Sequence, residues 1–334
     1  MSEVARVTPS APIRRLFLPL AAITVASVII AAAAVMRMAT SAPGSPSTPA
    51  SRFTIELPPG VRLDGTATQR LAISPDGRRI ALNAGTGDDR LLYVRSLDQI
   101  DAAPVGGVEG APGSLFFAPD GDWIGFHDTS SGAIRKIRVG GGQTATVAEA
   151  SAAIEGFRDA SWGSDGRIAF STRSSRGLMQ VRDAGGTPQP MTRPPAGEIH
   201  GQPHFLPDGS LLFSSTRPAT SDRIMALSRE TLEQRDLLDG TSPRLAASGH
   251  LVFLREGSLW AAPFDTARLQ VTGDAVPVLE DVGVSGNRGA VGFGATALYD
   301  LAGNGTLVYS RSADGKIVVV LNWFDEIGRK APAR

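Results

Sequence analysis

The sequence predicts an all-β protein, a six-bladed β-propeller, and three observations support this prediction. A unit of strand, tight turn, strand, loop and strand first occurs at 69–98 and returns along the chain. The last turn glycine recurs from Gly77 to Gly305 at spacings of 44, 45, 43, 40 and 56 residues. Apolar residues at helical spacing are scarce after residue 50. A period of about 45 residues is typical of four-stranded propeller blades rather than of helical repeats.

The first unit shows how residue types produce the strands. In SPDG at 74–77 the proline fixes φ, Asp76 can accept a hydrogen bond from the backbone two residues on, and Gly77 tolerates positive φ. A hairpin turn is therefore expected between LAIS and RRIALNA, and LLYVRSL forms a third strand. Because the aspartates recur at one position of the repeat, we expect them to form turns rather than to catalyse. The expected turn residues are Asp76, Gly77, Asp120, Gly121, Asp165, Gly166, Asp208 and Gly209.

The two ends of the repeat region predict how the ring closes. RFTIELPPG at 52–60 reads as a strand, whereas the last unit runs from its third strand directly into WFDEIGRK, whose spacing predicts a short amphipathic helix. We therefore expect 52–58 to supply the outer strand of the last blade. The Gly-rich run 280–295 is expected to be a flexible loop on one rim.

Composition excludes several functions. Lys plus Arg and Asp plus Glu both number 33, so the net charge is zero and no basic surface predicts nucleic acid as a partner. The absence of cysteine excludes disulfides, thiolate metal sites and a cysteine nucleophile.

The amino-terminal segment predicts delivery across a membrane. Residues 16–36 carry no charge and are long enough to span a bilayer as a helix. We expect a short cytoplasmic tail, 1–15, before this helix and a Ser/Pro/Ala linker, 37–51, after it. The propeller is expected over 52–334. A competing interpretation is a cleaved signal, since RRLFL resembles the twin-arginine export motif and TSA at 40–42 could be the cleavage site. The first interpretation gives a single-pass protein of the bacterial inner membrane with its propeller in the periplasm or exterior, and the second an exported protein.

The repeats carry a family resemblance. LAISPDGRRIAL, FFAPDGDWIGF, SWGSDGRIAF and FLPDGSLLF, with RFTIELPPG before them, resemble TolB-like propellers with WD40-like PDG repeats over roughly 52–334. They are similar to the extracytoplasmic propellers of bacterial eukaryotic-type serine/threonine kinases. The sequence contains no kinase Gly-rich loop, HRD or DFG, so kinase activity does not transfer. The chain is then a stand-alone relative or comes from a longer gene, and the resemblance implies a sensor domain or an envelope scaffold.

One cluster of polar residues is a candidate site. Strand periodicity would direct Glu198, His200, Gln202 and His204 to one face, where a carboxylate and two imidazoles could bind a metal. Alternatively they are hydrogen-bonded strand and loop residues, or contact a ligand, and Gly201 and Pro203 can interrupt the alternation. We expect no metal, and keep Glu198, His200 and His204 as weak candidates.

Other motifs predict structural roles. No G-x-S-x-G occurs, and VGGGQTATV at 139–147 lacks a phosphate-binding Lys-Ser/Thr, so it is expected to be a turn before an outer strand. Asp88 and Asp89 are expected to be solvated loop charges rather than calcium ligands. Trp123, Trp162, Trp260 and Trp323 are expected to pack between blades.

The sequence therefore predicts a non-catalytic module, without a cofactor, that senses a ligand or recognises an envelope protein. The alternatives are a TolB-like envelope scaffold and a propeller hydrolase or lyase. Binding is expected at the channel mouth and the rim loops 85–89, 127–132, 173–176, 216–222 and 283–295.

Overall fold

The computed structural model describes residues 49–63, 69–86, 89–217, 220–285, 296–312 and 316–332. The chain divides into two compact units, 1–48 and 49–334. The expected tail 1–15, membrane helix 16–36 and most of the linker 37–51 lie outside the described residues. In the part that is described, no helix is both long and apolar enough to cross a membrane.

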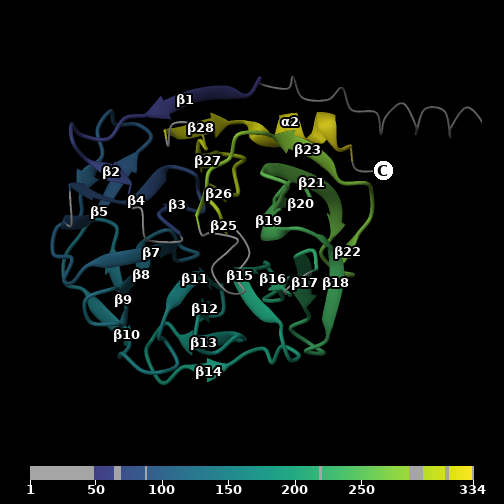
Figure 1. The fold of residues 1–334 in the computed structure, drawn as a ribbon. Helices are drawn as coiled ribbons and strands as arrows, with labels where there is room; N and C mark the ends of the chain where they lie inside the picture. The colour runs from purple at the N-terminus through teal and green to yellow at the C-terminus, as the bar shows by residue number, and fades with distance from the viewer. Residues whose placement is uncertain are drawn as a thin grey trace, which may run out of the picture. The chain divides into compact units, whose positions relative to one another are not determined.

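The described residues of 49–334 form six sheets arranged as blades around a central axis (Figure 1), beside one small two-stranded sheet, which confirms the predicted all-β six-bladed propeller. Blade 1 contains β2 (Arg62–Leu63), β3 (Leu71–Ile73), β4 (Arg79–Thr86), β5 (Asp89–Ser96) and β6 (Ala103–Pro104). Blade 2 contains β7 (Pro112–Phe117), β8 (Trp123–Asp128), β9 (Ile134–Arg138) and β10 (Ala145–Ala148). Blade 3 contains β11 (Phe157–Trp162), β12 (Arg167–Thr172), β13 (Leu178–Arg182) and β14 (Gln189–Pro190).

The second half of the ring repeats this order. Blade 4 contains β15 (Ile199–Phe205), β16 (Leu211–Thr216), β17 (Arg223–Leu227) and β18 (Gln234–Asp239). Blade 5 contains β19 (Thr241–Ala246), β20 (His250–Arg255), β21 (Ser258–Asp265), β22 (Gln270–Val271) and β23 (Val276–Leu279). Blade 6 contains β26 (Tyr299–Leu301), β27 (Leu307–Ser310), β28 (Ile317–Leu321) and β1 (Ser51–Ile55). The first strand of each blade contacts the first strands of its neighbours, so β3, β7, β11, β15, β19 and β26 surround the axis.

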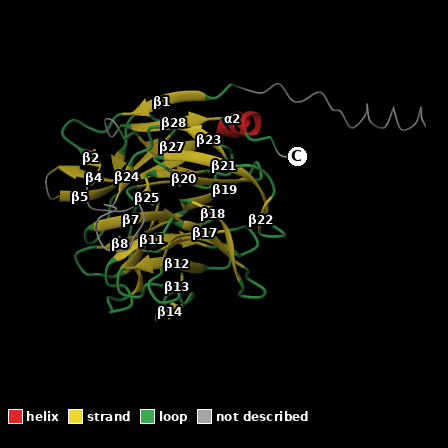
Figure 2. Cartoon of the chain, turned by 45° about the vertical axis from the view of Figure 1, so that its right-hand side comes forward, coloured by secondary structure: helices red, strands yellow, loops and turns green. Residues whose placement is uncertain are grey.

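The ring closes as predicted, through a strand taken from the start of the propeller. β1 pairs antiparallel with β28, from Ser51 opposite Leu321 to Ile55 opposite Ile317. The predicted amphipathic helix follows as α2 (Trp323–Lys330), the only helix in the described part of the chain (Figure 2). Its Trp323 and Ile327 are fully buried in a core cluster shared by blades 5 and 6. Both chain ends therefore stabilise the same blade.

The first turn of each blade has the geometry that its residues favour. The Oδ1 atoms of Asp76, Asp120, Asp165 and Asp208 accept hydrogen bonds from the backbone N–H two residues on, at 3.0, 2.9, 3.2 and 2.9 Å. The following glycines all have positive φ, from 72° at Gly77 to 86° at Gly209. These turns all lie at the same end of the blades because each one joins the first strand to the second.

The insertion before blade 6 is predicted to be a loop, but its first residues include a short strand. β24 (Val284–Ser285) pairs antiparallel with β25 (Thr296–Ala297), while 286–295 lie outside the described residues. Thr296 and Ala297 lie beside the channel, so this short hairpin enters its lining. The sequence did not predict it because the pairing joins two-residue strands on either side of a Gly-rich run.

Candidate functional site

Four inner strands carry an irregularity at the same level of the channel. The register with the second strand shifts between Pro112 and Leu115, Phe157 and Ala160, Gly201 and His204, and Thr241 and Arg244. Such bulges redirect side chains and interrupt the alternation of a strand. At two of them Gln202 and Ser242 adopt positive φ values of 53° and 55°. Their polar side chains line a narrow cavity along the axis, together with Asp159 and Thr296.

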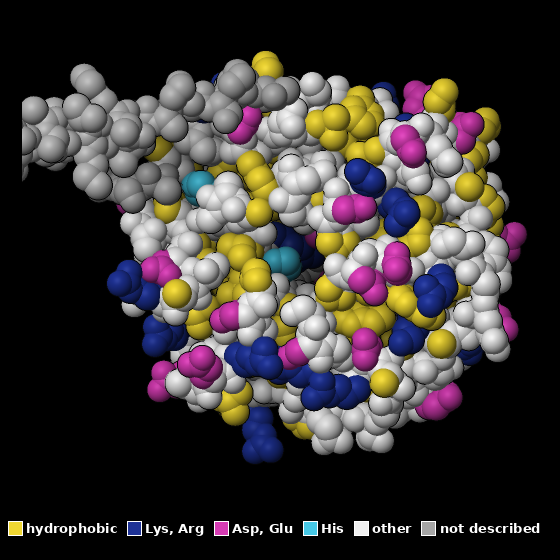
Figure 3. Space-filling model, turned by 180° about the vertical axis from the view of Figure 1, so that it is seen from behind, with side chains coloured by type: hydrophobic (Ala, Val, Ile, Leu, Met, Phe, Trp, Pro, Cys, Tyr) yellow, Lys and Arg dark blue, Asp and Glu magenta, His cyan; other side chains and the backbone are white. Residues whose placement is uncertain are grey.

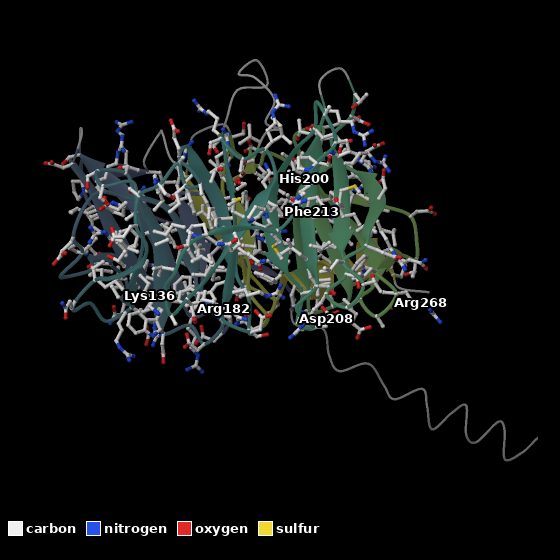
Figure 4. All side chains as sticks on the ribbon, turned by 90° about the horizontal axis from the view of Figure 1, so that it is seen from below. Lys136, Arg182, His200, Asp208, Phe213 and Arg268 are labelled. Carbon is white, nitrogen blue, oxygen red and sulfur yellow. The ribbon has the colours of Figure 1, made fainter. Side chains whose placement is uncertain are left out.

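The bulge in β15 separates the candidate residues predicted from the sequence. Gln202 and His204 line the channel, whereas Glu198 and His200 are buried near the other face of the propeller. Figure 4 shows His200 and Phe213 near one face and Asp208, in the turn after β15, at the opposite one. The expectation that all four side chains share one face is therefore wrong, because the bulge changes the side to which the later residues point.

Glu198 and His200 are held by neighbouring polar groups. The Thr192 hydroxyl lies 2.8 Å from His200 Nδ1, and the imidazole packs against Phe213 with ring centroids 4.7 Å apart. Glu198 accepts a hydrogen bond from Ser215 at 2.9 Å and forms an ion pair with Arg217. Burial lowers the pKa of His200 to about 4, against the raising effect of Glu198, so the imidazole is neutral at pH 7.

No metal site emerges from these residues. The described parts of the chain contain no group of three or more His, Cys, Asp or Glu residues that could hold a metal ion. Among the candidate calcium ligands, Asp88 lies outside the described residues and Asp89 is the first residue of β5.

A cavity of about 370 Å³ opens where the channel meets the face of the Asp-Gly turns. It is lined by residues of all six blades, including one residue from each first turn, such as Pro75, Pro119 and Gly303. Its walls include Phe116, Phe117, Trp162 and Phe205. Figure 3 shows a hollow at the centre of one face, with histidine and basic side chains inside and hydrophobic side chains around it. His204 and Arg244 are the histidine and the basic residue among the residues that line the cavity.

An ion pair between two blades forms part of the floor. Arg244 Nε of blade 5 lies 3.1 Å from Asp300 Oδ1 of blade 6, and its Nη1 donates to the Pro243 carbonyl oxygen at 2.9 Å. Asp300 Oδ2 accepts a hydrogen bond of 3.0 Å from the backbone N–H of Ile73 in blade 1. Burial by itself would lower the pKa of the Arg244 guanidinium, but Asp300, together with smaller effects of Tyr299 and Asp159, raises it overall. Arg244 therefore stays charged, and its contact with Asp300 joins three blades.

Some hydrogen-bonding groups of the floor have no protein partner. No described residue hydrogen-bonds to either ring nitrogen of His204 or to Nη2 of Arg244, although both side chains line the cavity. Burial, with a smaller effect of Arg244, lowers the pKa of His204 to about 3. The neutral imidazole offers one donor and one acceptor. The cavity thus combines aromatic walls with a floor that can donate and accept hydrogen bonds.

The sequence contained an unused signal for this floor. His204, Arg244 and Asp300 each lie five residues before the last turn glycine of their blade, at the position that Ala72, Phe116 and Ser161 occupy in blades 1 to 3. An alignment of the repeats would have shown that only blades 4, 5 and 6 carry an ionisable residue at this position.

The loops expected to bind ligands lie elsewhere. The described parts of 85–89, 127–132, 173–176 and 216–222 connect second strands to third strands, so they lie on the face opposite the cavity.

One predicted tryptophan contact between blades is present. Trp162 packs edge-to-face on Phe116 of the neighbouring blade, with ring centroids 6.2 Å apart. Trp162 also lines the cavity.

Comparison with known proteins shows the fold. No protein-family model and no curated protein matches the sequence. A protein of unknown function from Bacteroides thetaiotaomicron is 11% identical, with a TM-score of 0.56 over 82% of this chain and 76% of its own. A protein provisionally named TolB from Agrobacterium tumefaciens is 15% identical, with a TM-score of 0.53 over 81% of this chain and 96% of its own. Oligogalacturonate lyase from Vibrio parahaemolyticus is 10% identical, with a TM-score of 0.51 and the same coverage. The chain is thus a six-bladed propeller structurally similar to TolB and oligogalacturonate lyase propellers.

Proposed function

We propose that this chain is a membrane-anchored recognition module, without catalytic activity of its own, that binds a small ligand at the mouth of its channel. The uncharged segment 16–36 would anchor it and place the propeller outside the cytoplasm. The observation that carries the proposal is the preformed cavity of about 370 Å³ lined by all six blades. Ligand sites typically are concave and mostly apolar, with a few convergent polar groups.

The chemistry of the cavity favours an uncharged ligand with an apolar body and one polar end. The positive charge of Arg244 is already paired with Asp300, so a carboxylate ligand gains little attraction from it. Neutral His204 and the Nη2 atom of Arg244 can bind an amide, carbonyl or hydroxyl group. Trp162 and Phe205 provide apolar surface for the rest of the ligand.

The scaffold alternative would require an exposed apolar patch. The exposed large apolar side chains of the described residues are Leu91, Ile100, Leu232 and Val284. They lie on separate parts of the fold, in β5, the turn after β5, the turn between β17 and β18, and β24. The cavity is therefore the better-supported binding surface.

The proposal is tested by thermal shift on the full chain in detergent, with uncharged amides, lactones and sugars compared with matched carboxylates. We expect uncharged compounds to raise the melting temperature because they bind only the folded state. The His204→Ala variant should retain the unliganded melting temperature, since no described residue hydrogen-bonds to this side chain, and should bind about tenfold more weakly.

Two further variants make the test specific. Ala247→Phe places a ring at an exposed position of the cavity rim and should block binding without a cost to the core. His127→Ala is the matched control, because His127 stacks on Phe157 away from the cavity and its loss should leave binding unchanged. The proposal would be contradicted if no compound of the panel raises the melting temperature. It would also be contradicted if a ligand raises the melting temperatures of both His204→Ala and Ala247→Phe as much as that of the unmodified chain.

A further inference from the structure

A second concave site lies between blades 1 and 2. A groove of about 550 Å³ is lined by residues of β4, β5 and β6 on one side, and on the other by Asp122 in the turn before β8, the end of β9 and the turn after β9. Figure 1 shows these two blades side by side. None of its lining residues lines the central cavity, so it is a separate site.

Each wall of the groove contributes an arginine. Arg79 begins β4 and is half-buried, and Arg138 ends β9 and is exposed. No described residue forms a hydrogen bond or an ion pair with either guanidinium group. The guanidinium carbon of Arg138 lies over the Trp123 ring, 4.6 Å from its centroid, a cation–π contact that uses none of the N–H groups as hydrogen-bond donors to another side chain.

Glycine residues form part of the lining of the groove. Gly142 N–H donates to the Gly106 carbonyl oxygen at 3.1 Å, which ties the two blades together. A Cβ atom added to Gly106 or Gly140 would meet no heavy atom within 4 Å, so both glycines face open space. The glycine run predicted as a turn before an outer strand therefore gives the groove room at its base.

The charges of the lining favour an anion. Arg79 and Arg138 carry two positive charges, and Asp122 is the only acidic residue among the lining residues. Guanidinium groups bind phosphate and carboxylate oxygens in bidentate geometry, and such charge-assisted hydrogen bonds are stronger than neutral ones. We propose that this groove binds an oxyanion, a phosphate or a carboxylate group carried by a ligand that bridges blades 1 and 2.

Calorimetric titration of the full chain with inorganic pyrophosphate and with tricarballylate, at constant ionic strength, tests this proposal. Binding of one probe only would identify the preferred anion. We expect Arg79→Gln and Arg138→Gln each to weaken binding about tenfold. Asp122→Asn should strengthen it about threefold, because a repulsive charge is removed. This opposite effect cannot arise from damage to the fold.

Two variants complete the design. Gly140→Ala adds a methyl group in open space at a position without positive φ, so it should weaken binding while leaving the melting temperature unchanged. Arg193→Gln removes an exposed arginine outside the groove and should have no effect. The proposal fails if neither probe binds, if Arg79→Gln and Arg138→Gln bind as the unmodified chain does, or if Arg193→Gln weakens binding equally.

Discussion

Asp300 joins three blades at the seam of the ring, so its removal should destabilise the whole propeller. Asp300→Ala deletes the 3.1 Å contact with Arg244 and the 3.0 Å hydrogen bond from Ile73, and it leaves a mostly buried guanidinium without this partner. Only 11% of the Arg244 side chain is exposed. Removing one member of a buried pair typically costs about 3–5 kcal/mol. For a unit of this size we expect the melting temperature to fall by roughly 5–10 °C.

Urea unfolding of the full chain, followed by tryptophan fluorescence, measures this free energy. The double variant Arg244→Met/Asp300→Ala should be more stable than Asp300→Ala alone, because no unpaired charge remains. Arg268→Ala is the control: its ion pair with Asp265 is exposed, so its loss should cost much less stability than the loss of Asp300. A cost below about 1 kcal/mol for Asp300→Ala, or a double variant less stable than the single one, would refute the reasoning.

Two further predictions concern the turns and pH. Gly77→Ala should destabilise the protein by about 2 kcal/mol or more, because φ is 72° and the new Cβ would lie 2.3 Å from the Asn304 amide. Gly249→Ala has a similar φ of 77° but no neighbour within 4 Å, so it should cost only about 1 kcal/mol. Equal melting temperatures of the two variants would contradict this prediction. Burial lowers the pKa of His200 from its ordinary value of 6.5 to about 4, so the unfolded chain binds more protons than the folded chain, and His200 should cost up to about 3 kcal/mol of stability as pH drops from 6.5 to 4. His204, whose pKa is about 3 in the folded chain, should add a loss of similar size over this range. His200→Gln should therefore make the pH profile of stability less steep without removing its slope, and an unchanged slope would exclude a contribution from His200.

The fold could be predicted from the sequence because each blade repeats the same short turn and strand motifs. The turn at 74–77 combines a residue with fixed φ, a carboxylate that accepts from the backbone and a glycine at positive φ, and all three effects act within four residues. The closing strand was predictable for a different reason: an alternating strand at 52–58 had no partner nearby, and the last blade had no outer strand. Both arguments rely on hydrogen-bond requirements that the sequence itself displays.

The candidate site was less predictable because it depends on bulges and on the closed ring. The bulge at Gln202 changes the face to which His204 points, and a period-2 argument has no means of detecting a residue in the left-handed region. Arg244 and Asp300 meet only because blades 5 and 6 are neighbours, although 56 residues separate them in sequence. Their shared position in the repeat was visible, but its orientation towards the channel was not.

The pairing of β1 with β28 also determines when the protein can be completed during synthesis. β1 is synthesised before every other described strand of the ring, yet its partner β28 is the last of them and ends at Leu321. Until then the growing chain exposes the unpaired edge of β1 and the open side of blade 1, which are surfaces prone to intermolecular pairing. The ring therefore stays open at this seam until β28 has been made and β1 can pair with it.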